Sequence, residues 1–292
     1  MKLRASLCLL FRLRPIGLAL CGVFVVFSHF ALAQENLRPA TPFKLFDNLY
    51  YVGLQNVSSY VLKTSQGLIL IDTTYEDTAN VIPQSMQQLG LNPKDVKYII
   101  ITHGHTDHVG GAAAMQKLTG ARVGMALGDW EMYEKGGYTS SRGEKRAFPA
   151  LKRDLVIKDG DSIKVGDTTV KMYITPGHTP GGTSLEFPVM GQGKTYKAFM
   201  FGGLGLNTVN GVRTTEQYIA SVKRVMAMPG LEVNITNHPD AAQIFQKHEK
   251  LAARKPGGPN PYVDPDGYRA YLQTLLTNAE KKLAAEKAAN RP

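Results

Sequence analysis

The chain has 292 residues and a formal net charge of +10. The basic residues are spread along it, so the charge gives no indication of a nucleic-acid-binding protein. Its two cysteines, Cys8 and Cys21, both lie within the first 33 residues. The remainder therefore has no disulfide, and thiolate zinc sites and cysteine nucleophiles are excluded there.

The first 33 residues are typical of a secretory signal peptide. An apolar run covers residues 16–30, and Ala31-Leu32-Ala33 gives a small-x-small cleavage pattern before Gln34. A retained membrane anchor is less favoured, because the run is shorter than the roughly 20 residues that a spanning helix needs. A lipoprotein at Cys21 is weaker still, since bulky Leu20 precedes the cysteine. We expect cleavage after about Ala33 and a periplasmic or secreted protein without stable membrane insertion. The basic residues of this leader are Lys2, Arg4, Arg12 and Arg14.

Cleavage there removes 33 of the 292 residues and leaves 259, enough for one large or two modest domains. The leader carries four of the 34 basic residues and none of the 24 acidic ones, so the net charge falls to +6. This mild excess suits attraction to anionic small molecules or envelope surfaces and gives no reason to expect nucleic acid as a partner.

Strands and helices alternate in the first half of the exported part. A turn at residues 65–67 predicts a hairpin, and Gly90 and Gly120 are expected to end helices. This alternation predicts an α/β layered domain. The expected strands are residues 49–52, 59–62, 68–72, 96–102 and 121–125, and the expected helices are residues 78–89 and 110–118.

A cluster of metal-ligating residue types follows the strand expected at residues 96–102. His103, His105, Asp107 and His108 place three imidazoles and one carboxylate within six residues. Imidazole suits zinc, copper, iron and nickel, and the mixed nitrogen and oxygen set favours zinc. The alternative is a solvated polar loop, but four such side chains packed together would be unusual without a cation.

The second half repeats the theme. Strands are expected at residues 154–157, 162–165, 168–175, 183–187, 195–201 and 233–236, with helices at 215–227 and 241–253. After a Pro/Gly-rich break, a last helix is expected from Pro265 to about Ala288, with apolar residues mostly along one face. We interpret it as a docking helix, with an interfacial membrane helix as the alternative. Two halves that each supply strands and then helices suit two packed sheets with helices outside.

Three further histidines of the part after Ala33 lie outside the cluster. His178 follows the strand expected at 168–175 in a Gly/Pro-rich turn, and His238 follows the strand expected near 233–236. Site residues often lie where strands end and loops begin, so both are candidate ligands. His248 instead follows Ile244 and Phe245 on an expected helix. We interpret it as a packed or rim histidine.

The segment from His103 to His108 resembles the metal motif of the metallo-β-lactamase superfamily. The resemblance spans roughly residues 43–283 and implies an αββα sandwich of two mixed sheets with helices outside, forming one hydrolase domain over residues 34–292. It also implies two zinc ions per chain. His103, His105 and His178 would hold the first, and Asp107, His108 and His238 the second.

The second ligand set is most similar to that of the subclass-three metallo-β-lactamases. Many other members bridge the two metals with an aspartate, and the corresponding stretch Phe201-Gly202-Gly203-Leu204-Gly205 has no acid. This departure counts against the glyoxalase-like and typical lactonase-like branches. The runs at residues 177–181, 237–239 and 260–268 agree with the subclass.

The resemblance implies an enzyme that opens β-lactam rings. Zinc lowers the pKa of bound water to about 7, which provides a hydroxide nucleophile at neutral pH. Asp107 would be the catalytic residue that orients this nucleophile. One alternative keeps the site but changes the substrate to a lactone, such as an acyl-homoserine lactone, or another cyclic ester or amide. The other is a non-catalytic metal-binding envelope protein.

The segment at residues 128–148 has two interpretations. The favoured one is an ordinary solvated connection. In the functional alternative it folds over the site, where Trp130, Tyr133 and Tyr138 would form apolar walls. The side chains that would then meet a substrate carboxylate are Arg142, Lys145 and Arg146.

Overall fold

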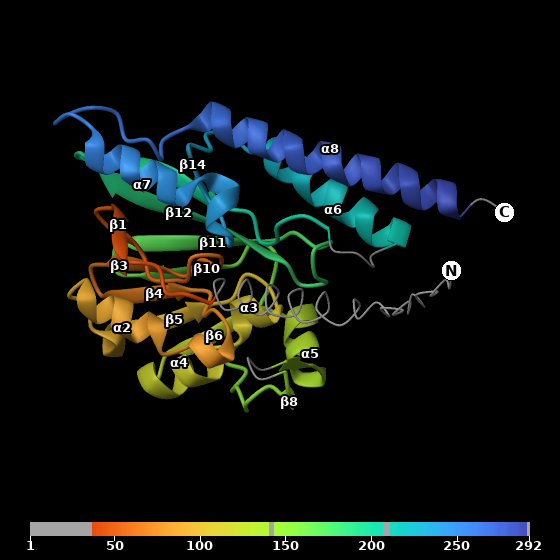
Figure 1. Cartoon of the computed structure of the whole chain (residues 1–292), viewed down its shortest axis with the longest axis horizontal. Helices are drawn as coiled ribbons and strands as arrows, with labels where there is room; N and C mark the ends of the chain where they lie inside the picture. The colour runs from red at the N-terminus through yellow and green to blue at the C-terminus, as the bar shows by residue number, and fades with distance from the viewer. Residues whose placement is uncertain (1–36, 140–142, 207–210, 291–292) are drawn as a thin grey trace, which may run out of the picture. The chain divides into compact units, whose positions relative to one another are not determined.

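Two β-sheets lie face to face, with helices on their outer faces (Figure 1). The computed structural model describes residues 37–139, 143–206 and 211–290, so the expected signal peptide lies outside the described residues. The predicted αββα sandwich is confirmed. Among the described residues, no helix combines the length and the apolar character that crossing a membrane requires.

The first sheet has the strand order β1-β2-β3-β4-β5-β6-β9. Its first four strands are antiparallel, whereas β4, β5, β6 and β9 run parallel. Thr64 pairs with Gly67 across the predicted hairpin turn. The strands are β1 (Phe43–Phe46), β2 (Leu49–Tyr51), β3 (Tyr60–Thr64), β4 (Gly67–Ile71), β5 (Val96–Ile100), β6 (Arg122–Ala126) and β9 (Leu155–Ile157).

The second sheet has the order β10-β11-β12-β13-β14. It is antiparallel except for the parallel pair β13 and β14. A small ribbon of β7 (Gly137–Thr139) and β8 (Lys145–Ala147) stands apart from both sheets. The strands of the second sheet are β10 (Ser162–Val165), β11 (Thr168–Ile174), β12 (Thr183–Gly191), β13 (Lys194–Met200) and β14 (Val233–Ile235).

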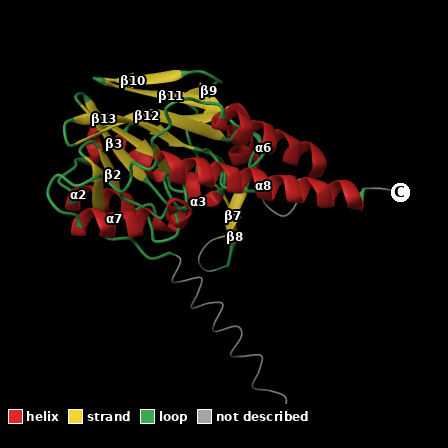
Figure 2. Ribbon diagram, turned by 90° about the horizontal axis from the view of Figure 1, so that it is seen from above, coloured by secondary structure: helices red, strands yellow, loops and turns green. Residues whose placement is uncertain are grey.

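Helices cover the outer face of each sheet (Figures 1 and 2). The first sheet is covered by α2 (Val81–Gln88), α4 (Ala112–Thr119) and α5 (Leu127–Lys135). The second is covered by α6 (Gly211–Met226) and α8 (Pro265–Ala289), which pack against each other through Tyr218, Val222, Leu272 and Leu276. The short helix α3 (Thr106–Val109) and the helix α7 (Ile244–Ala253) complete the set.

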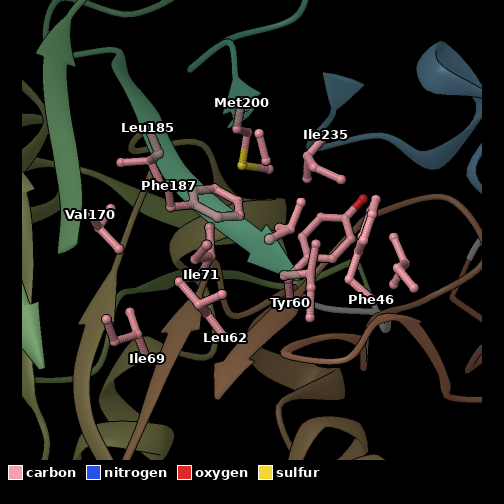
Figure 3. Close-up of a cluster of buried hydrophobic side chains, with 14 of the residues drawn as sticks. Phe46, Tyr60, Leu62, Ile69, Ile71, Val170, Leu185, Phe187, Met200 and Ile235 are labelled. Atoms are coloured by element: carbon pink, nitrogen blue, oxygen red, sulfur yellow. The ribbon is translucent and has the colours of Figure 1, made fainter. Parts of the chain in front are cut away.

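Successive side chains of a strand point to opposite faces of the sheet, and so contribute to different layers of the core. Ile69 and Ile71 of β4 face the second sheet, while Leu68 and Leu70 face the helices. Because both faces of the sheet are buried, this strand is apolar at every one of these positions. Figure 3 shows the layer between the sheets, where Phe187 lies among side chains from both.

Two expected helices are shortened or divided in the structure, and one helix was not expected. The helix expected at 78–89 begins at Val81, because residues Glu76–Thr78 form a 3-10 turn. The helix expected at 241–253 is divided by Gln243, whose φ of 54° interrupts it after the 3-10 turn Pro239–Ala242. Helix α5 was not expected from its sequence, because Gly128 and Asp129 have low helix propensity. The segment is helical because its packing against the rest of the fold outweighs that propensity.

Candidate metal centre

The candidate ligands come from strand ends that meet at one edge of the sandwich. β5 runs directly into His103 and His105, and β11 and β14 lead into His178 and His238. The backbone N–H of Thr183, at the start of β12, donates to the carbonyl of Thr102 at 2.7 Å. This bond joins the two sheets beside the site, so ligands more than 70 residues apart become neighbours.

The first cluster consists of His103, His105 and His178. His103 is buried, and the other two are half-buried. The Nε2 atoms of His103 and His178 lie 3.2 Å apart. One nitrogen from each ring falls within 4.8 Å of the others. The structure therefore brings together the three histidines expected at the first metal position.

The second cluster consists of Asp107, His108 and His238. Asp107 Oδ2 lies 3.1 Å from His108 Nε2 and 3.6 Å from His238 Nε2. Asp107 and His108 sit on α3, a helical turn in a segment where a loop was expected. This turn lets adjacent residues both point into the cluster, and β14 supplies the third from far along the chain.

The hydrogen bonds around the histidines aim their nitrogens into the clusters. Gly205 O accepts from His178 Nδ1, and Asn56 O accepts from His238 Nδ1, both at 2.8 Å. A carbonyl cannot donate, so Nδ1 carries the proton and Nε2 presents its lone pair, as in metal-ligating histidines. The Nε2 of His108 is buried and faces Asp107 Oδ2 at 3.1 Å without the geometry of a hydrogen bond. A cation between these groups would satisfy all of these donor atoms, so the residues fit a metal.

The two clusters differ in their electrostatics. Burial, followed by the neighbouring imidazoles, holds the pKa of His103 well below its usual value and lowers that of His178 to about 4. Burial alone would also lower the pKa of His108, but Asp107 and Asp72 more than offset it and raise that pKa. Burial would raise the pKa of Asp107, yet His108 and His238 hold it below its usual range. The first cluster is therefore neutral, whereas the second contains an ion pair.

Asp72 supports the second cluster from behind, and sequence reasoning did not single it out. It accepts hydrogen bonds at 2.7 Å from both the backbone N–H and the hydroxyl of Thr102, and it lies 3.1 Å from His108 Nδ1. Its φ of 58° is rare for a non-glycine residue and marks a backbone held by its surroundings. The position of this acid directly after the apolar strand β4 was the feature of the sequence that could have indicated its role.

A pocket of about 500 Å³ opens over both clusters. This volume lies within the range of small-molecule sites. One wall is apolar and contains Met132, Phe148 and Leu204. The remaining lining residues are Gly104, His105, Thr106, Asp107, Gly136, Gly137, His178 and His238.

The functional alternative for residues 128–148 is wrong for two of its apolar wall residues, Trp130 and Tyr133. Trp130 is fully buried and donates through Nε1 to Leu155 O at 2.8 Å, and Tyr133 is buried against Phe148. The rotation of α5 turns these two rings into the core and leaves Met132 to face the pocket. Lys145 and Arg146 are exposed on β8 and are not among its lining residues. The Tyr138 side chain and Arg142 lie outside the described residues.

The stretch at Gly202 to Gly205 packs tightly against the first cluster. A Cβ on Gly203 would lie 2.4 Å from the Cβ of His178. A side chain of any kind, an aspartate included, would collide with this ligand. Gly205 contributes the carbonyl that accepts from His178.

His248 lies away from both clusters. Its ring stacks on Phe43 with centroids 3.9 Å apart, and burial lowers its pKa. The interpretation of His248 as a packed or rim histidine is confirmed.

Known proteins with a similar sequence or fold were found by comparison of the family models, the curated sequences and the solved structures. The model of the metallo-β-lactamase superfamily matches residues 52–191. The subclass B3 metallo-β-lactamase BJP-1 of Bradyrhizobium japonicum is similar with a TM-score of 0.78 and 34% identity, over 89% of this chain and 99% of that one. The class B3 di-zinc metallo-β-lactamase LRA-12 from an Alaskan soil metagenome is similar with a TM-score of 0.74 and 25% identity, over 85% and 96%. A hydroxyacylglutathione hydrolase of Maricaulis maris is 27% identical over 221 residues, 73% of each chain.

Proposed function

The chain belongs to the metallo-β-lactamase superfamily, and from this premise we propose that it is an exported dizinc hydrolase that opens β-lactam rings. The carrying observation is the second cluster, in which Asp107, His108 and His238 converge beside three histidines. The stretch from Phe201 to Gly205, where a bridging acid would be expected, has no acid, and a side chain on Gly203 within it would collide with His178. This combination favours the lactamase branch.

Zinc in these two clusters would supply a water activated at neutral pH and would polarise the carbonyl under attack. The protein's own residues do the rest. Asp107 orients the attacking water through the oxygen that is not engaged as a ligand. The apolar wall of Met132, Phe148 and Leu204 holds an uncharged part of the substrate over the clusters and excludes water there.

The proposal is tested by assaying the purified mature protein against a chromogenic cephalosporin and an acyl-homoserine lactone in parallel. We expect zinc-dependent ring opening of the cephalosporin, abolished by chelation and restored by added zinc. Lactone turnover without cephalosporin turnover would contradict it. Export is tested by sequencing the N-terminus of the protein recovered from the periplasm, which should begin at about Gln34.

A second candidate is hydrolysis of a lactone or another ester. It is favoured by the similarity to the hydroxyacylglutathione hydrolase, which extends over most of both chains. A hydroxyacylglutathione belongs in the same assay as a third substrate. The glycine at position 203 weighs against this candidate, because no acid can bridge the two clusters there.

A further inference from the structure

We propose that Asp129 is a positioning residue that fastens the loop of His103 and His105 to the loop of His178, and so sets the zinc affinity of the first cluster. Asp129 lies near the start of α5 and is completely buried. It is not one of the candidate metal ligands, and nothing in the surrounding sequence indicates a function for it. The inference rests on the metal centre proposed above.

Both oxygens of Asp129 hold the ligand loops. Oδ2 accepts from the backbone N–H of Gly104 at 3.0 Å and from the hydroxyl of Thr179 at 2.8 Å. Oδ1 accepts from the backbone N–H of Gly181 at 2.8 Å. Gly104 separates His103 from His105, and Thr179 follows His178 directly. One carboxylate therefore ties down both segments that carry the first cluster.

Glycines let α5 approach both loops closely. A Cβ on Gly181 would lie 2.8 Å from Asp129 N, and one on Gly128 would lie 2.9 Å from Pro180 Cβ. A Cβ on Gly104 would lie 3.0 Å from Met132 Cε. The contact is thus made by backbone, by the Asp129 carboxylate and by the ends of the Pro180 and Met132 side chains. A junction of this kind transmits any shift of α5 to the ligands.

The negative charge of Asp129 is a second way in which it can favour zinc binding. The groups that hydrogen-bond to it are neutral donors, and a buried carboxylate without a cationic partner is costly. The three histidines of the first cluster bring no negative charge to offset a dication, whereas the second cluster has Asp107 and, behind it, Asp72. Asp129 brings a buried carboxylate to the two loops that carry the first cluster.

The test measures zinc affinity, with no substrate involved. Asp107→Asn combined with His238→Ala disables the second cluster, so that chelator competition reports on the first alone. In this background we expect Asp129→Asn to weaken zinc binding by about 10- to 100-fold, the range quoted for partners that orient metal ligands. The asparagine keeps the shape but turns an NH₂ toward a backbone N–H. Glu131→Gln, an exposed acid on the same helix that pairs with Lys135, is the matched control and should leave the affinity unchanged within twofold.

Thr179→Val keeps the inference testable if Asp129→Asn fails to fold. It removes one of the three hydrogen bonds and preserves the volume, so we expect a threefold or greater weakening of zinc binding. Circular dichroism and thermal melting of the metal-free variants separate a loss of affinity from a loss of fold. Folded Asp129→Asn with parental zinc affinity overturns the inference, as does Thr179→Val if it alone folds and binds normally. Parental protein that binds zinc but leaves β-lactams intact would instead overturn only the proposed substrate.

Discussion

In the proposed mechanism, Asp107 is both a metal ligand and the residue that orients the attacking water. Asp107→Asn keeps one oxygen donor and the shape of the side chain but loses the negative charge beside His108 and His238. We expect turnover to fall by at least ~10²-fold, comparable with the upper cost of disturbing outer-shell metal partners. Ring opening is measured with zinc in excess, together with metal content and circular dichroism. A folded variant within threefold of the parent would show that Asp107 is not the catalytic ligand.

Two histidines only ten positions apart differ in their expected roles. His238 ends a strand and is held toward Asp107 by Asn56, whereas His248 stacks on Phe43 far from both clusters. His238→Ala should lose the metal of the second cluster and most turnover. His248→Gln should keep both. The measurements are metal content and steady-state kinetics, and equal behaviour of the two variants would contradict the assignment.

The ionisation of His108 predicts how zinc binding depends on pH. Its pKa in the metal-free protein is raised, so it is protonated at neutral pH and must lose that proton to bind a metal. Affinity at the second cluster should therefore fall about tenfold per unit as the pH drops from 8 to 7. The first cluster, whose histidines have lowered pKa values, should bind equally well at both. Calorimetry in buffers of different ionisation enthalpy should show about one proton released for each zinc ion bound at the second cluster. Proton release on binding at the first cluster instead would contradict the assignment of the protonated histidine to the second cluster.

At the scale of elements, the loop after β13 holds His178 by close contact. Gly203→Ala places a Cβ where 2.4 Å separates it from His178 Cβ, so either the loop or the ligand must move. We expect loss of first-site zinc and at least ~10-fold lower turnover, on the scale of disturbed metal-ligand supports. Gly191→Ala, in β12 of the same sheet, meets its nearest atom at 3.3 Å and serves as the control. A fully metallated, active Gly203→Ala would disprove the close packing described here.

At the scale of the whole molecule, the two candidate metal clusters bring the two sheets together. Residues that follow β5, β11 and β14 meet there, and the part of the chain after Ala33 has no cysteine to make a disulfide. Metal analysis of protein purified without chelator should give close to two zinc ions per chain, since six ligands exceed the four that one tetrahedral ion takes. A reproducible value near one with zinc in excess would exclude a dinuclear site. Chelation should lower the melting temperature, because a ligand at 100 times its Kd stabilises by about 2.7 kcal/mol.

The sequence by itself determined the layered fold and the set of candidate ligands. Strand periodicity and turn residues locate most strands within one or two positions, because those signals are local. The six candidate ligands that converge in the structure could be named from the sequence because His103 to His108 form a dense cluster, and because His178 and His238 each follow an apolar strand.

Only the tertiary structure decided what supports and surrounds those ligands. Asp129 meets Gly181 across 52 positions and Asp72 meets His108 across 36, and no local pattern encodes such pairs. The rotation of α5 is likewise set by packing, which is why Trp130 lies in the core and Met132 in the pocket. Residue type specifies what a side chain can bind, but only the meeting of distant strand ends determines which neighbours orient it.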